Sequence, residues 1–219
     1  MINSRQLVAG FALSLAAVTP AVAQVSWTDW TASGVNSASG TMFGGTVGVS
    51  YSGSYSFVQT GCGTNFWTFP ATYTSGSVPT PPPACDIVAL NAGGLKTITF
   101  TQAVVNPLLA VASWNGQAAV VFSSPIEVLS QGQGYWGVGT LTATGNTLAV
   151  SGEGHGVIRL LGTFTSVSFT DGSENWHGIT VGAQEIAPAV GVVPEPATYA
   201  LMTGGLAVLA AVRRRRTAA

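Results

Sequence analysis

Hydrophobic and polar positions alternate over most of the chain, in short runs separated by Gly, Pro, Asn and Ser. Alternation with a period of two residues predicts strands that are buried on one face. We expect strands at residues 27–30, 41–51, 54–58, 97–101, 108–113, 118–122, 126–129, 141–144, 147–150, 156–161, 163–170 and 176–183, with a polar turn at 33–40. No amphipathic helix is expected among them.

The hairpin at residues 141–150 is the strongest local signal. A Gly-Asn pair at 145–146 joins two alternating runs, and such a pair favours a two-residue hairpin turn. In that register Ala143 lies opposite Leu148, and Leu141 lies opposite Val150, so both apolar pairs share one face. The predicted fold class is therefore all-β, an antiparallel β-sandwich of jelly-roll type, with a closed barrel as the alternative.

Both ends of the chain differ from this pattern. Near the N-terminus, Arg5 precedes an apolar run at 7–18 and a small-residue site, which predicts a helical signal peptide over 1–23 that is cut between Ala23 and Gln24. Near the C-terminus, Pro194, Glu195 and Pro196 precede an uncharged run at 197–212. The run ends on four arginines, Arg213, Arg214, Arg215 and Arg216.

The apolar run at 197–212 predicts a C-terminal transmembrane helix. Its length as a helix is about 24 Å, and the flanking arginines can extend toward the headgroups of a bilayer with a core of about 30 Å. Each arginine would cost about 2.5–3.5 kcal/mol at the centre of the bilayer, so the arginine cluster serves as a cytoplasmic stop signal. The rest of the chain then lies on the outer side of the membrane.

The order of Pro-Glu-Pro, apolar helix and arginine cluster over residues 193–219 resembles the PEP-CTERM sorting signal. The resemblance implies an exopolysaccharide-producing Gram-negative bacterium and a membrane protease, exosortase, that recognises the motif and removes the helix. It also implies a transient inner-membrane anchor, followed by release to the cell surface or the extracellular matrix. The alternative is an ordinary membrane anchor. The expected organisation is thus a signal peptide at 1–23, a β domain at 24–190 and a sorting tail at 191–219.

The β domain also looks like the β domains that accompany this sorting tail, in the stretch from residues 106–107 through 164–166 to 174–176 and 178–180. Those domains have no generally assigned activity. Between its ends the chain holds two cations, Lys96 and Arg159, against seven acids, for a formal net charge of −5. This balance excludes a nucleic-acid partner, and no cofactor is expected. Residues 132–137 match G-x-G-x-x-G, but no helix follows, so we interpret them as a turn.

Cys62 and Cys85 are the only cysteines. Export places them in an oxidising compartment, which predicts a disulfide. The enclosed segment contains four prolines, and we expect a loose excursion that the bond tethers.

Few side chains are candidates for catalysis or metal binding. If Glu153 and His155 met Glu174 and His177, a carboxylate–imidazole or metal site could form; the glycines beside Glu153 favour two solvated loop pairs instead. Asp171 and Glu174 stand in an oxygen-rich run that could form a calcium site, although Asp-Gly is also a common turn.

Among six tryptophans, Trp67 and Trp136 are flanked by polar residues, so we expect them to be exposed and able to bind a ligand. Our first hypothesis is a non-enzymatic structural or adhesive surface protein. The alternative is a carbohydrate-binding module for exopolysaccharide, and the third hypothesis is a glycan hydrolase. Exposed tryptophans in a groove favour the second, and paired carboxyl groups across a cleft favour the third.

Overall fold

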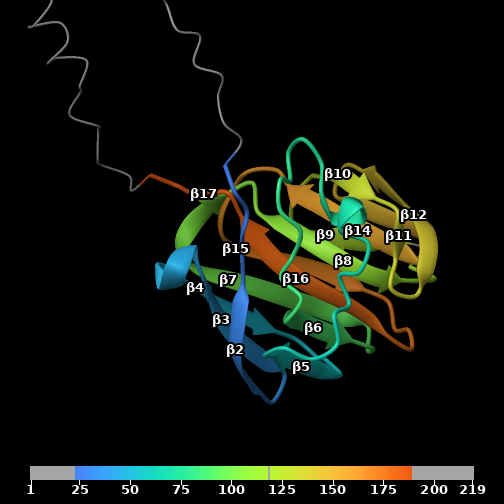
Figure 1. Cartoon of the computed structure of the whole chain (residues 1–219), viewed down its shortest axis with the longest axis horizontal. Coiled ribbons are helices and arrows are strands. Elements are labelled where there is room, and N and C mark those ends of the chain that lie inside the picture. Colours follow the sequence, from blue (N-terminus) through green and yellow to red (C-terminus); the bar gives the residue numbers. More distant parts are fainter. Residues whose placement is uncertain (1–22, 118, 189–219) are drawn as a thin grey trace, which may run out of the picture.

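The computed structural model describes residues 23–117 and 119–188, which form two antiparallel sheets (Figure 1). The seven-stranded sheet runs in the order β10 (Ile126–Gln131), β14 (Gly154–Leu160), β8 (Leu108–Trp114), β16 (His177–Ala183), β6 (Asp86–Leu90) and β5 (Phe57–Thr60), with β1 (Ser26–Trp27) paired to β16.

The ten-stranded sheet runs in the order β11 (Gln133–Gly134), β12 (Gly137–Thr144), β13 (Thr147–Gly152), β9 (Val120–Phe122), β15 (Thr163–Asp171), β7 (Gly94–Val105), β4 (Val47–Ser52), β3 (Ser37–Met42) and β2 (Asp29–Gly34), with β17 (Glu185–Ile186) paired to β7. Two short 3₁₀ turns, η1 (Phe43–Gly45) and η2 (Pro70–Tyr73), complete the described elements. The prediction of an all-β fold with two antiparallel sheets is confirmed, and the finer jelly-roll assignment stays a prediction.

The predicted hairpin register is confirmed. In the β12–β13 pair, Ala143 lies opposite Leu148 and Leu141 opposite Val150. Leu141, Leu148 and Val150 are buried in the core between the sheets, so the turn and the hydrophobic pattern specify the same face.

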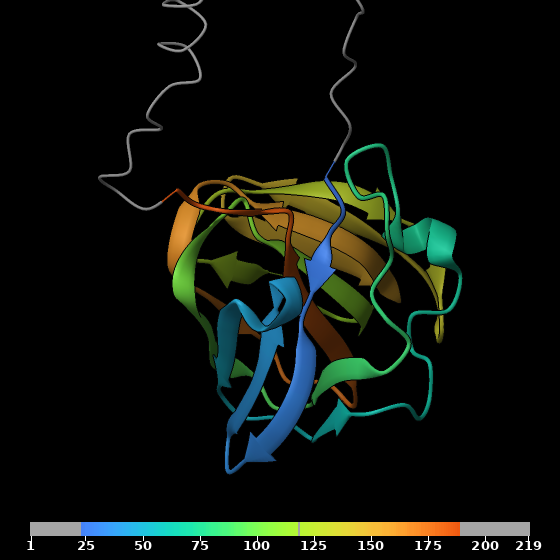
Figure 2. The same cartoon turned by 60° about the vertical axis from the view of Figure 1, so that its left-hand side comes forward.

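The N-terminal part was predicted less well. Residues 33–40 form the tip and one side of a β2–β3 hairpin instead of a polar turn (blue in Figure 2). The inward-facing positions of β3 include Ala38 and Gly40, and a Cβ on Gly40 would lie 2.2 Å from the carbonyl oxygen of Asp29. Alanine and glycine among serines give no clear apolar–polar alternation, so a closely packed strand of small residues resembles a polar turn. The single strand predicted at 41–51 is also wrong, because η1 separates β3 from β4.

The predicted signal peptide, apart from Ala23, and the whole predicted C-terminal helix lie outside the described residues. Across residues 23–117 and 119–188, no helix has the length and apolarity needed to cross a membrane.

The segment between Cys62 and Cys85 covers the outer face of the seven-stranded sheet, where it crosses β8 and β16 (Figure 1). Its side chains Trp67, Tyr73 and Val78 join a second apolar cluster with residues of the sheet, among them Ile87, Leu108, Ala110, Ala112 and Val157. The expectation of a loose excursion is therefore wrong. This cover also explains why β6, β8 and β16 are buried at every position.

The predicted disulfide between Cys62 and Cys85 is present. Reducing it should lower the free energy of unfolding by about 3 kcal/mol, because the bond closes a loop of roughly two dozen residues in the unfolded chain. Urea unfolding of the oxidised protein and of a Cys62→Ser/Cys85→Ser double variant measures this difference. Equal stability of the two forms would show that packing of the covering segment alone holds it in place.

Candidate functional site

Three neighbouring strands of the seven-stranded sheet bring distant residues to one edge. Strand β8 lies between β14 and β16 and is antiparallel to both. The C-terminal end of β8 therefore meets the N-terminal ends of β14 and β16. This arrangement gathers residues 113–117, Glu153 and the loop at 172–176 at the same edge.

These segments surround an open hollow of about 660 Å³. Its lining comprises Ser113, Asn115 and Gly116 after β8, Glu153 before β14, residues 173–176 before β16, and Trp136 from the turn between β11 and β12. Trp136 comes from the other sheet, so the two sheets share the site. A smaller hollow of about 330 Å³ on β2, β3 and β4 is lined mainly by Ser, Ala and Gly and offers far less chemistry.

A β-bulge positions Ser113. Trp114 pairs with Gly154 and Val111 with Gly156, so two residues of β8 stand opposite the single residue His155. Ser113 has a φ of 55°, which is unusual for a residue with a side chain. The bulge directs the Ser113 hydroxyl to the carboxylate of Glu153, to which it donates a hydrogen bond.

His155 is completely buried beneath this bulge. Its Nδ1 accepts a hydrogen bond from the backbone N–H of Ser113 at 3.1 Å, and the hydroxyl of Tyr73 lies 3.1 Å from the same nitrogen. Because Nδ1 is an acceptor, the ring proton is on Nε2, which has no partner among the described residues. Burial lowers the pKa of His155 to about 4, although the charge of Glu153 opposes this shift.

Asn115 connects the two glutamates. Its side-chain amide donates to Glu153 Oε1 at 2.6 Å, and its backbone N–H donates to Glu174 Oε2 at 2.8 Å. The amide of Gln117 donates to the other oxygen of Glu174 at 3.0 Å. Every carboxylate oxygen of the pair thus accepts a hydrogen bond, which holds both groups at the hollow.

A buried chain of charges supports Glu174 from below. Lys96 Nζ lies 2.9 Å from Asp171 Oδ1 and also donates to the carbonyl oxygens of Ala92 and Gly94. The other oxygen of Asp171 lies 2.9 Å from His177 Nε2. His177 Nδ1 lies 3.0 Å from Glu174 Oε1, at ion-pair distance but without the alignment of a hydrogen bond.

His177 is the central member of this chain. Burial opposes its charged form, but Asp171 and Glu174 outweigh burial and raise the pKa of His177 above its ordinary value. Trp114 packs edge-on against its ring, with centroids 5.5 Å apart. The His177 ring between two carboxylates therefore fixes the loop that carries Glu174.

An aromatic cluster forms one wall of the hollow. Trp136 is 57% exposed and contacts Tyr135 and Trp176 at steep angles, with ring centroids 4.8 Å and 6.3 Å away. Phe66 packs on Trp176 at 5.0 Å and on Tyr135 at 5.3 Å. These neighbours hold Trp136 in place while its ring remains accessible to a ligand.

The outcome for the predicted site residues is mixed. Glu153 and Glu174 share one hollow, and His177 lies directly below it. Both histidines are fully buried in strands, so the expectation of two solvated loop pairs is wrong. Asp171 is not available as a calcium ligand, because its oxygens contact Lys96 and His177. Within residues 23–117 and 119–188, no group of three or more His, Cys, Asp or Glu could hold a metal ion.

The two predicted tryptophans behave differently. Trp136 is exposed, as expected, and its role in binding stays a prediction. The expectation for Trp67 is wrong: it is 2% exposed, its indole N–H donates to the carbonyl oxygen of Asp86, and it packs on Tyr73. The stretch at 132–137 holds a turn, as interpreted, but only residues 135–136 form it, because 133–134 are β11 and β12 begins at Gly137. Gly134 is required there because a Cβ would lie 2.1 Å from the ring of His155.

Sequence reasoning missed Ser113, Asn115, Gln117 and Trp176 as members of the site. A weak signal was present, since Asn115, Gly116 and Gln117 directly follow β8, which is apolar apart from Ser113. Nothing in the sequence showed that this strand lies between β14 and β16, the strands that directly follow Glu153 and the loop with Glu174.

The C-terminal segment contains a known sorting motif. Residues 192–216 match the family model described as the PEP-CTERM protein-sorting motif. This motif marks an exported surface protein that crosses the membrane and is targeted to exosortase, its processing partner. The chain thus carries a PEP-CTERM sorting signal behind its β domain. No curated protein and no solved structure matches the chain.

Proposed function

We propose that this exported protein is a non-enzymatic surface protein that binds a carbohydrate chain, such as exopolysaccharide, in the hollow beside Trp136. The observation that carries the proposal is an exposed indole ring, fixed by other aromatic rings, beside a set of hydrogen-bonding groups. Sugars combine apolar C–H faces with hydroxyl groups. The aromatic wall can pack against the C–H faces, and the carboxylate and amide groups of Glu153, Asn115 and Asn175 can form hydrogen bonds with the hydroxyl groups.

The hollow is also built to be rigid. Bonds from Ser113 and Asn115 fix Glu153, while the buried chain of Lys96, Asp171 and His177 supports Glu174. Binding then requires little ordering of side chains, which reduces the entropic cost of association. Expected processing by exosortase at Pro194, Glu195 and Pro196 would deliver this binding surface to the cell exterior.

Replacing Trp136 by alanine should weaken binding of oligosaccharides from the host's own exopolysaccharide about tenfold or more, because truncation removes the apolar wall. Isothermal titration calorimetry measures the change. Phe69→Ala is the matched control, since Phe69 is 47% exposed and does not line the hollow. Equal affinities for the Trp136→Ala variant and the unaltered protein would refute the proposal.

A glycan hydrolase is the second candidate, since Glu153 and Glu174 lie in one hollow. Glycoside hydrolysis needs one carboxyl group that donates a proton to the leaving oxygen. Here every oxygen of both groups accepts a hydrogen bond instead, which favours binding over cleavage. Incubation with the same polysaccharide should release no new reducing ends. Release that stops in a Glu153→Gln variant would establish the hydrolase.

A further inference from the structure

The charge of the hollow limits the class of glycan that it can bind, provided that the proposed function holds. Glu153 and Glu174 both reach the hollow, yet their charges are balanced differently. Glu174 has the buried imidazole of His177 at 3.0 Å, and the raised pKa of that ring favours its positively charged form. The partners of Glu153 in the hollow, Ser113 and Asn115, are neutral donors. Glu153 therefore presents an uncompensated negative charge to a ligand.

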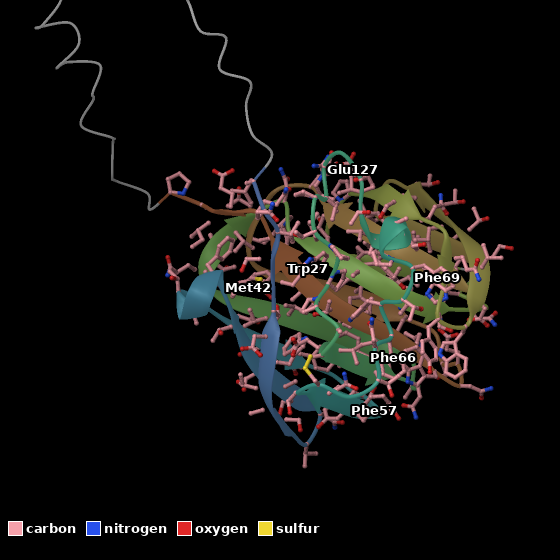
Figure 3. The ribbon with its side chains drawn as sticks, viewed as in Figure 1. Trp27, Met42, Phe57, Phe66, Phe69 and Glu127 are labelled. Carbon is pink, nitrogen blue, oxygen red and sulfur yellow. A yellow bond between two sulfur atoms is a disulfide. The ribbon has the colours of Figure 1, made fainter. Side chains whose placement is uncertain are left out.

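The cations of the described chain cannot supply that compensation. Lys96 is completely buried and donates to three acceptors below the site. Arg159 forms its ion pair with Glu127 and lies on β14, six positions after Glu153, a distance of about 20 Å in an extended strand. In Figure 3, Glu127 is labelled at the upper edge of the molecule, and Phe66, which belongs to the aromatic wall, is labelled well below it.

The aromatic wall adds to this preference for a cation. The face of a tryptophan ring attracts ammonium groups, and the exposed ring of Trp136 lines the same hollow as Glu153. A sugar that carries a carboxylate or sulfate would instead bring a second negative charge toward Glu153. Like charges at close range reduce affinity and reject such ligands.

We propose that the hollow selects glycans with free, protonated amino groups, such as partly deacetylated hexosamine polymers, and rejects polyuronates. In this arrangement Glu153 binds the ammonium group, and Trp136 contacts the sugar ring or the ammonium group itself. Acetylation of the amine removes the charge and with it the contribution of Glu153.

Three hexasaccharides test the proposal by titration at pH 6 and low salt: glucosamine, N-acetylglucosamine and galacturonate oligomers. The glucosamine hexamer should bind about tenfold or more tightly than its acetylated form, and the galacturonate hexamer should show no measurable binding. This comparison uses the unaltered protein, so it does not depend on the folding of any variant. Equal or tighter binding of the galacturonate hexamer would overturn the proposal.

A pair of variants separates the site from the overall negative charge. Glu153→Gln should weaken binding of the glucosamine hexamer about tenfold and leave the acetylated hexamer nearly unchanged. Glu185→Gln is the control, because it removes the same charge from an exposed position on β17 outside the hollow. If both variants lose the same affinity for the glucosamine hexamer, the preference for it reflects the overall negative charge of the protein, and the proposed role of Glu153 is wrong. If Trp136→Ala binds every glycan as the unaltered protein does, the proposed function itself fails.

Discussion

Replacing Lys96 by methionine should lower the free energy of unfolding by about 3–5 kcal/mol, the usual cost of removing one partner from a buried ion pair. The side chains of Lys96 and Asp171 are fully buried. Methionine has a similar length and fills the space, so the loss isolates the charge of Asp171. That carboxylate would then have only His177 opposite it, and His177 is shared with Glu174.

Arg159→Met is the matched control for this substitution. Arg159 and Glu127 also form an ion pair, but their side chains are 26% and 40% exposed. Exposed pairs contribute about 0–1 kcal/mol, so this variant should stay close to the unaltered protein. Urea unfolding followed by tryptophan fluorescence measures both variants. Similar losses in the two would mean that the buried charge chain does not stabilise the fold.

Acidification from pH 6.5 to 4 should destabilise the protein, with His155 contributing roughly 3 kcal/mol at about 1.36 kcal/mol per pKa unit. Burial lowers the pKa of His155 to about 4 in the folded state, while the unfolded chain keeps a value near 6.5. Between these values the unfolded state binds more protons than the folded state. The stabilisation is therefore complete above about pH 6.5 and is lost as the pH falls toward 4.

His177 has the opposite dependence. Its pKa is raised in the folded state, so its stabilisation is complete below its unfolded value and is lost as the pH rises through the folded value. The two histidines together predict a maximum of stability in the weakly acidic range. Unfolding free energies measured from pH 4 to 8 test this.

A His155→Asn variant should flatten the acidic side of that curve, since asparagine does not titrate and its carbonyl can accept the N–H of Ser113. It should cost stability at every pH because of the smaller side chain. An unchanged acidic slope would show that other groups cause the acid sensitivity.

The sequence predicts the elements of this fold better than their arrangement. The register of the hairpin at 141–150 could be predicted because the turn and the two apolar pairs all require the same register. Residues 33–40 were predicted as a polar turn but form part of the β2–β3 hairpin. Their small inward-facing residues allow two backbones to approach closely, and an apolar–polar pattern does not show this. Trp67 was predicted to be exposed because its neighbours in the sequence are polar. It is buried because the segment between Cys62 and Cys85 folds back over a sheet whose outer face is apolar.

The candidate site depends on strand order, which local patterns do not contain. Glu153 and Glu174 were visible as isolated acids, yet their meeting requires β8 to lie between β14 and β16. The buried chain behind them was equally hidden, because it depends on the pairing of β7 with β15. In that pairing Lys96 lies opposite Phe169, and Phe169 precedes Asp171 by two residues. By contrast, the sorting motif is a linear signal, and the sequence alone was sufficient to find it.

Matrix retention of the exported protein tests the central claim most directly. The measurement is the fraction of exported protein that stays with the extracellular matrix in cells producing either the unaltered chain or the Trp136→Ala variant. The account predicts that the unaltered protein stays in the matrix and that the variant, exported in the same amount, is found in the medium. Retention of the variant at the level of the unaltered protein would contradict glycan binding at this hollow.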